Sequence, residues 1–198
     1  MILFLTLAES AWAQRIPPKA RLMGPVLCKH IGEVFGPNPP CATALGLVET
    51  ESAFNAGALS TAGAMGPGQF MPATARALAK KYPKQLGDMK PNDWVWTGKA
   101  IAILWKELMT SYLPTSASEC SAALFTMSGY NGGPVALARE RAMCQVAGGC
   151  DPGQWYNNVE LQKSRAEWAF KENRDYVSKV ITRGFKYANA NMGRAFCQ

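Results

Sequence analysis

The 198-residue sequence has a single histidine, His30, and no two cysteines separated by two residues. Protein zinc sites normally combine closely spaced histidine and cysteine ligands, so we predict no metal site. The hydrophobic runs are short, and none reaches the roughly 18 residues that a membrane-spanning helix requires. Repeats, low-complexity tracts and long linkers are also missing. The composition, 48% hydrophobic and 18% charged, fits one globular domain with a substantial core.

The sequence does contain six cysteines, an even number that favours disulfides in an oxidising compartment. Sequence alone does not choose among the possible pairings. A disulfide between Cys144 and Cys150 could close a glycine-rich turn at residues 148–153. Buried free thiols are the alternative.

Residues 1–13 differ from the rest of the chain. An apolar stretch at residues 2–8 is followed by Ala11-Trp12-Ala13, which has the small-x-small form of a signal-peptidase site. No lysine or arginine precedes the stretch, so an ordinary first helix is the competing interpretation. We predict a signal peptide over residues 1–13 and a mature domain over residues 14–198.

The formal net charge is +7, and it becomes +8 without residues 1–13, which hold Glu9 and no lysine or arginine. Nucleic acid and a polyanionic cell envelope are both possible partners for such a surface. The basic residues are scattered, and no nucleic-acid-binding module is recognisable. We therefore predict an envelope partner and no nucleic acid.

The remaining pattern is helical, and no segment has the alternation of a strand. Asn92 or Asp93 can cap one long helix, Ser118 can cap another, and Pro134 can open a third. Trp94 and Trp96 could stack on sugar rings, but core packing is the commoner role of tryptophan. The sequence predicts an all-α fold with helices over residues 18–36, 41–51, 73–82, 93–112, 118–128, 134–145, 155–161 and 171–190.

Residues 48–74 are the most informative stretch. An apolar helix brings Glu49 and Glu51 to its end, a glycine-rich connector covers residues 55–68, and Pro72 starts the next helix. A carboxyl group beside the negative end of a helix dipole has a raised pKa, which suits a general acid. Glu49 points to a different side of the helix from Glu51, and we interpret it as a solvated or hydrogen-bonded side chain.

The order of residues in this stretch resembles the core of the soluble lytic transglycosylase family. The resemblance is carried by Glu51-Ser52-x-Phe54-Asn55, Ser60, Gly63-Ala64-x-Gly66, Gln69 and Met71-Pro72-x-Thr74. Two later segments, Tyr130-Asn131-Gly132-Gly133 and Glu172-Asn173-x-x-Tyr176-Val177, occur in the family's order. The resemblance implies a single lysozyme-like helical domain that cleaves the glycan strands of peptidoglycan without a cofactor.

The resemblance also implies roles for individual residues. Glu51 occupies the catalytic position, and Ser60 the position of a serine that helps to place groups near it. Tyr130 matches a tyrosine whose hydroxyl approaches the glutamate, although a packed aromatic at a helix end is the alternative. The implied substrate-binding residues are Ser60, Gln69, Met71, Tyr130, Asn131 and Tyr176, of which Tyr176 could instead belong to the core.

Most glycosidases place two carboxylates on either side of the scissile bond, but the next acids along this chain are Asp88 and Asp93. The family's chemistry, as the resemblance implies it, needs one glutamate. Glu51 protonates the leaving sugar, the substrate's N-acetyl group stabilises the anomeric centre, and Glu51 then takes the proton of the C6 hydroxyl. The product is 1,6-anhydro-muramic acid. The chain departs from the family's common Gly-Leu-Met-Gln at residues 66–69, Gly-Pro-Gly-Gln, which alters the groove wall.

The sequence therefore predicts a periplasmic or secreted lytic transglycosylase. A hydrolytic muramidase on the same fold, in which water replaces the C6 hydroxyl, is the first alternative. The second is a non-catalytic peptidoglycan-binding accessory of an envelope-spanning secretion or conjugation machine. The retained set of Glu51, Ser60, Gln69 and Tyr130 favours catalysis.

Overall fold

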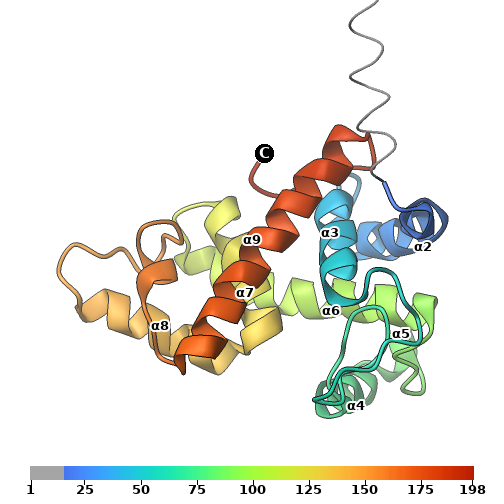
Figure 1. The fold of residues 1–198 in the computed structure, drawn as a ribbon, viewed down its shortest axis with the longest axis horizontal. Helices are drawn as coiled ribbons and strands as arrows, with labels where there is room; N and C mark the ends of the chain where they lie inside the picture. Colours follow the sequence, from blue (N-terminus) through green and yellow to red (C-terminus); the bar gives the residue numbers. More distant parts are fainter. Residues whose placement is uncertain (1–15) are drawn as a thin grey trace, which may run out of the picture.

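The computed structural model describes residues 16–198, and α-helices make up most of that part of the chain (Figure 1). This confirms the predicted all-α class. The only β pairing among the described residues consists of two isolated bridges, Leu59 with Met65 and Met65 with Phe70. The α-helices are α2 (Pro18–Phe35), α3 (Cys41–Ser52), α4 (Pro72–Lys81), α5 (Pro83–Leu86), α6 (Trp94–Tyr112), α7 (Glu119–Gly132), α8 (Pro134–Val146) and α9 (Glu167–Asn189).

Local capping signals predicted several helix starts correctly. Asp93 caps α6 by accepting a hydrogen bond from the Trp96 amide at 2.8 Å, and Ser118 caps α7 by accepting one from the Ser121 amide at 3.0 Å. Pro72 and Pro134 open α4 and α8 at the first helical position.

Two predicted helix boundaries and one predicted short helix were wrong. The helix expected to end at residue 128 continues to Gly132, and the last helix begins at Glu167, four residues before the predicted start. Residues 155–161 form turns and one short 3₁₀ helix, Val159–Leu161, instead of the predicted helix. The predicted signal peptide, residues 1–13, lies outside the described residues.

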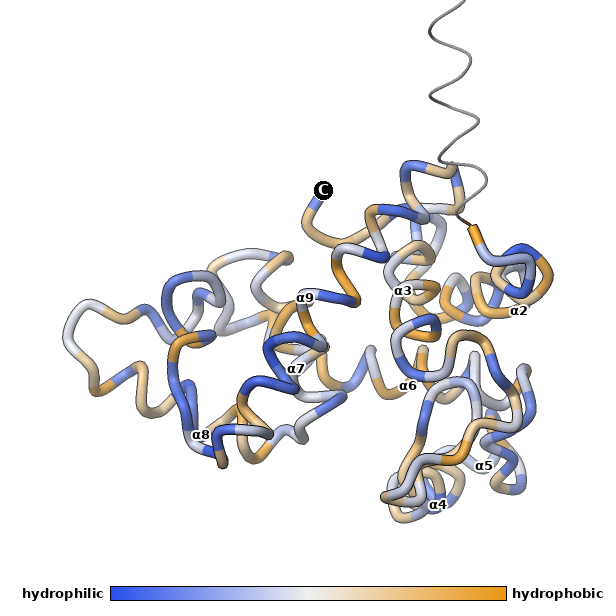
Figure 2. Tube along the Cα trace, viewed as in Figure 1, coloured by the Kyte–Doolittle hydropathy of each residue, from blue (hydrophilic) through white to orange (hydrophobic). Residues whose placement is uncertain are grey.

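The centre of the fold is the packing of α3 against α9, which run side by side (Figure 1). Residues 41–48 of α3 are buried without interruption. Figure 2 shows α3 as largely hydrophobic, whereas hydrophobic and hydrophilic residues alternate along α9. A Cβ on Gly46 would lie 2.6 Å from the Val180 carbonyl oxygen and 2.7 Å from the Gly184 amide nitrogen. Glycine at position 46 therefore permits the close crossing of the two helices.

Three disulfides join Cys28 to Cys41, Cys120 to Cys197 and Cys144 to Cys150. The expectation of disulfides is thus confirmed, including the small loop closed between Cys144 and Cys150. The other two bridges link α2 to α3 and the start of α7 to the end of the chain.

The two tryptophans that could have stacked on sugar rings pack in or against the core, Trp96 fully and Trp94 in part. Trp96 is buried and meets the Phe70 ring edge-on at 5.6 Å, and Trp94 stacks on Phe54 at 6.3 Å between ring centroids. No helix among residues 16–198 has the length and apolar character needed to cross a membrane.

Candidate active site

A groove of about 530 Å³ lies between the end of α3, the connector after it, and helices α7 and α9. Six of the seven predicted site residues line it, and the seventh, Tyr176, contacts Glu51. Leu104 on α6 lines this groove and also a second hollow of about 710 Å³. The groove is lined by Glu51, Ser60, Thr61, Ala62, Ala64, Gln69, Phe70, Met71, Thr74, Leu104, Tyr130, Asn131, Trp168 and Glu172.

Glu51 occupies the last turn of α3. The helix ends because Ala53 and Phe54 both adopt left-handed backbone conformations, with φ of 50° and 61°. Phe54 is buried among core aromatics, and the Ser52 hydroxyl donates to the Pro67 carbonyl at 2.9 Å. These contacts fix the helix end, and with it Glu51, against the connector.

Burial raises the pKa of Glu51 to about 7. A hydrogen bond from the Tyr176 hydroxyl to Oε1 of Glu51, 2.7 Å long, opposes that rise because it favours the charged carboxylate. The negative charge of Glu172 adds to it. Desolvation, rather than the helix dipole expected from the sequence, is the main cause. The result is a carboxyl group that exchanges its proton near neutral pH.

Two tyrosines flank Glu51, the buried Tyr176 and the partly buried Tyr130, and burial of their hydroxyls raises the pKa of both well above the usual range. They therefore remain neutral hydrogen-bond donors. Tyr176 donates to Glu51, whereas Tyr130 donates to the Gly68 carbonyl at 2.7 Å. Tyr130 lies close enough for the charge of Glu51 to raise its pKa, but Tyr176 is the tyrosine that bonds the acid.

The opposite wall is the connector of residues 55–71, which is held by its own polar groups. Ser60 Oγ accepts from the Ala64 amide at 2.9 Å, and Gln69 Nε2 donates to the Gly66 carbonyl at 2.9 Å. A Cβ on Gly66 would lie 1.8 Å from the Pro91 carbonyl oxygen, and one on Gly68 would lie 2.8 Å from the Phe70 ring. Ser60 and Gln69 thus shape the wall, and glycines let it pack closely.

Helix α9 presents Trp168, Glu172 and Tyr176 one turn apart along one side. Trp168 and Glu172 line the groove, and Trp168 is 72% exposed. Neither was predicted as a site residue from the sequence, where the search for a second acid covered only residues close to Glu51 along the chain. Glu172 is far from Glu51 in the sequence. However, it lies one helical turn before the predicted site residue Tyr176, and this spacing could have identified it as a groove residue. Trp168 lay outside the predicted helix.

Glu49 points away from the groove, as its position on the helix suggested. Its carboxylate accepts hydrogen bonds from Lys186 Nζ at 2.5 Å and from the Tyr187 hydroxyl at 2.8 Å. Glu49 therefore joins α3 to α9. Within residues 16–198 no group of three or more histidine, cysteine, aspartate or glutamate side chains could hold a metal ion.

Comparison with known proteins adds an independent finding. The family model described as "Transglycosylase SLT domain" matches residues 37–145, just over half of the chain. The match contains Glu51, the connector and the Tyr130-Asn131 pair, and α9 lies beyond it. No curated protein matches the sequence. The extent of the family match shows that this chain belongs to the soluble lytic transglycosylase family, which the SLT domain defines.

Proposed function

We propose that the protein is an exported lytic transglycosylase that cleaves the β-1,4 bond between N-acetylmuramic acid and N-acetylglucosamine, with Glu51 as its only general acid and base. One observation carries the proposal: the partly buried carboxyl group of Glu51, with a pKa of about 7, stands in a groove of a domain from a peptidoglycan-cleaving family. Residues 1–13 would be the signal peptide and residues 14–198 the enzyme in the periplasm or outside the cell.

In the proposed reaction, Glu51 gives its proton to the glycosidic oxygen as the bond to the anomeric carbon breaks. Since Tyr176 donates to Oε1, Oε2 is the oxygen left to hold the transferred proton. The carbonyl oxygen of the substrate's N-acetyl group stabilises the anomeric carbon. Glu51, now a carboxylate, removes the proton of the C6 hydroxyl, whose oxygen bonds to that carbon. A pKa near 7 suits both transfers.

Glu172 is the observation that favours a second candidate, a hydrolytic muramidase. A second carboxylate in the groove could activate water as inverting glycosidases do. In the lytic reaction Glu172 has a simpler role, because its charge helps to keep Glu51 protonated.

Mass spectrometry of the muropeptides that residues 14–198 release from purified peptidoglycan, with the disulfides intact, distinguishes these functions. Products that end in 1,6-anhydro-muramic acid support the lytic reaction, and reducing muramic acid would establish the hydrolase instead. If nothing is released, and Glu51→Gln behaves like the wild type, the protein would be a wall-binding accessory of a secretion or conjugation machine.

The Tyr176→Phe variant tests the electrostatics of the acid. Activity should fall as pH rises through about 7, because Glu51 must be protonated for the first step. Removing the hydroxyl removes the contact that favours the carboxylate, so the alkaline limb of the kcat profile should move up by about one pH unit. A limb that moves to lower pH would contradict this assignment.

Trp168→Ala should weaken glycan binding without unfolding the protein, since the exposed ring contributes little to the core. An aromatic face that packs on a sugar ring contributes about 1 kcal/mol, which corresponds to about a fivefold loss of affinity. Calorimetry with N-acetylglucosamine oligomers in the Glu51→Gln background measures this loss of affinity. Tyr156→Ala, which removes an exposed aromatic that does not line the groove, is the matched control and should bind like its parent.

A further inference from the structure

A buried ion cluster lies behind the groove. Glu140 on α8 has a fully buried side chain, and its two carboxylate oxygens accept hydrogen bonds from Arg165 Nε at 2.8 Å, Arg165 Nη2 at 3.0 Å and Arg174 Nη2 at 2.9 Å. The reaction proposed above uses none of these residues. The cluster therefore needs an explanation of its own.

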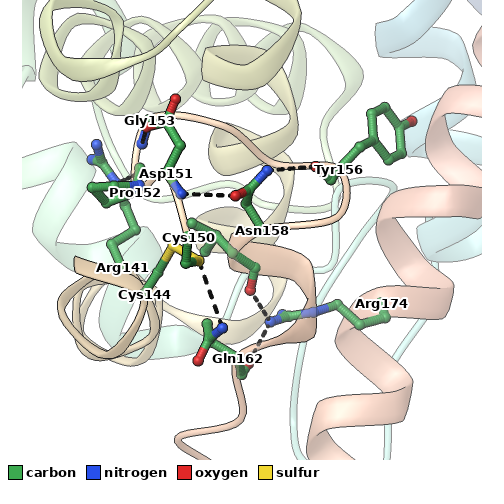
Figure 3. Close-up of a disulfide and its surroundings, with 11 residues drawn as sticks. Arg141, Cys144, Cys150, Asp151, Pro152, Gly153, Tyr156, Asn158, Gln162 and Arg174 are labelled. Carbon is green, nitrogen blue, oxygen red and sulfur yellow. Dashed lines mark hydrogen bonds between the residues drawn. A yellow bond between two sulfur atoms is a disulfide. The ribbon is translucent and has the colours of Figure 1, made fainter. Parts of the chain in front are cut away.

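Arg174 is held from several sides. Its guanidinium donates to the carbonyls of Val159, Glu160 and Gln162, which belong to the loop after α8. Figure 3 shows the Cys144–Cys150 disulfide beside this loop, with the Gln162 amide reaching toward Cys150 and the Gln162 carbonyl toward Arg174. Arg174 has no freedom to turn away from its neighbours.

Arg174 also donates through Nη1 to Oδ1 of Asn173 at 2.7 Å. A guanidinium has donors only, so the Asn173 atom that faces it must be the oxygen. The Ser128 hydroxyl donates to the same oxygen at 2.8 Å. The orientation of the Asn173 amide is therefore fixed by chemistry, and its NH₂ group must face the other way.

That NH₂ group donates to the Ser128 carbonyl at 3.0 Å and to Oδ1 of Asn131 at 2.9 Å. The same logic then applies to Asn131: the atom that faces a donor is its oxygen. Asn131 lines the groove, and within residues 16–198 its Nδ2 makes no hydrogen bond. The side chain thus offers N–H donors, rather than an acceptor, to whatever occupies the groove.

We propose that Asn131 donates a hydrogen bond to an N-acetyl carbonyl oxygen of the bound glycan, and that Asn173, oriented by Arg174 and Glu140, is the positioning residue that enforces this polarity. The proposal rests on the proposed function for the nature of the ligand. A sugar hydroxyl can both donate and accept, so it tolerates either orientation of an amide. A carbonyl accepts only, whereas the ammonium group of a de-N-acetylated sugar donates only. A fixed donor therefore selects N-acetylated strands.

Calorimetric binding in the Glu51→Gln background tests this with the tetramers of N-acetylglucosamine and of glucosamine, and it does so independently of any reaction. Asn131→Asp keeps the size of the side chain and leaves it only acceptors. We expect it to lower affinity for the N-acetylated tetramer about tenfold and to raise affinity for the glucosamine tetramer. The proposal would be overturned if Asn131→Asp kept the parent's preference between the two tetramers. It would also be overturned if the parent bound neither tetramer.

Asn173→Asp tests the positioning role, because it leaves Asn131 in place but removes the donor that orients it. The preference for the N-acetylated tetramer should shrink while the other groove residues are unchanged. Asn191→Asp, at a turn after α9, is the control and should keep the parental preference. If Asn173→Asp does not fold, NMR of the parent decides: the Asn131 side-chain NH₂ signals must shift when the N-acetylated tetramer binds, and their indifference would refute the contact. Only the muropeptide experiment decides which reaction the protein catalyses. The proposed lytic reaction and the proposed Asn131 contact can therefore fail separately.

Discussion

The Glu51→Gln variant should lose cleavage by about 1000-fold or more while it keeps its fold and its affinity for peptidoglycan. An amide is nearly isosteric with the carboxyl group, but it can neither give nor take the proton. General acid–base groups contribute rate factors of about 100 to 10,000, and in the proposed reaction one residue performs both transfers. The measurement is the rate of muropeptide release, with sedimentation on purified peptidoglycan as the binding readout.

Glu49→Gln is the matched control for this experiment. It lies two residues away on the same helix, and its carboxylate pairs with Lys186 and Tyr187 outside the groove. Its rate should fall less than about tenfold. Comparable turnover by Glu51→Gln and the wild type would refute the catalytic assignment.

The Glu51→Gln substitution should also change the free energy of unfolding in a pH-dependent way. The pKa of Glu51 is raised in the folded protein, so the folded state holds its proton more tightly than the unfolded state does. The wild type is thus relatively favoured below pH 4.5 and progressively loses stability between pH 4.5 and about 7. Glutamine does not titrate. At pH 8 Glu51→Gln should therefore be more stable than the wild type, by up to about 3 kcal/mol.

Glu140→Gln should strongly destabilise the fold. The carboxylate is fully buried between two arginines whose side chains are only 9% and 14% exposed. Removing one partner of a buried ion pair leaves uncompensated charge in a poorly solvated site, which costs about 3–5 kcal/mol. Urea denaturation followed by circular dichroism measures the change.

An exposed ion pair provides the comparison. Lys163 and Glu167 lie four residues apart, and both side chains are at least half exposed. Glu167→Gln should leave the unfolding midpoint within experimental error, because solvent screens such pairs. If Glu140→Gln unfolded at the same urea concentration as Glu167→Gln, the buried cluster would contribute nothing to stability.

The features that sequence predicted well are those fixed by neighbouring residues. Asp93, Ser118 and Pro134 mark helix starts because capping depends on a few adjacent groups. Glu51, which lines the groove, was singled out because the residues around it in the chain form a recognisable order. Residues 41–48 signalled a buried helix through their composition alone.

The features that sequence missed depend on contacts between distant segments. The Tyr130-Asn131-Gly132-Gly133 stretch looks like a turn, but Asn131 and Gly132 stay helical where Asn173 bonds to Asn131 and Arg165 packs against Gly132. The choice between Tyr130 and Tyr176 as the partner of Glu51 likewise depends on how α9 crosses α3. The pairing of Cys120 with Cys197 depends on where the end of the chain lies.

The close crossing of α3 and α9 at Gly46 has a consequence for motion. The wall that carries Glu51 belongs to the most deeply packed helices of the domain, which we expect to open only when the whole domain unfolds. The facing wall, residues 55–71, is held by turns and isolated bridges, so it should open locally on a much faster timescale. A glycan strand would then be accommodated by movement of one wall, while Glu51, the proposed proton donor, stays still.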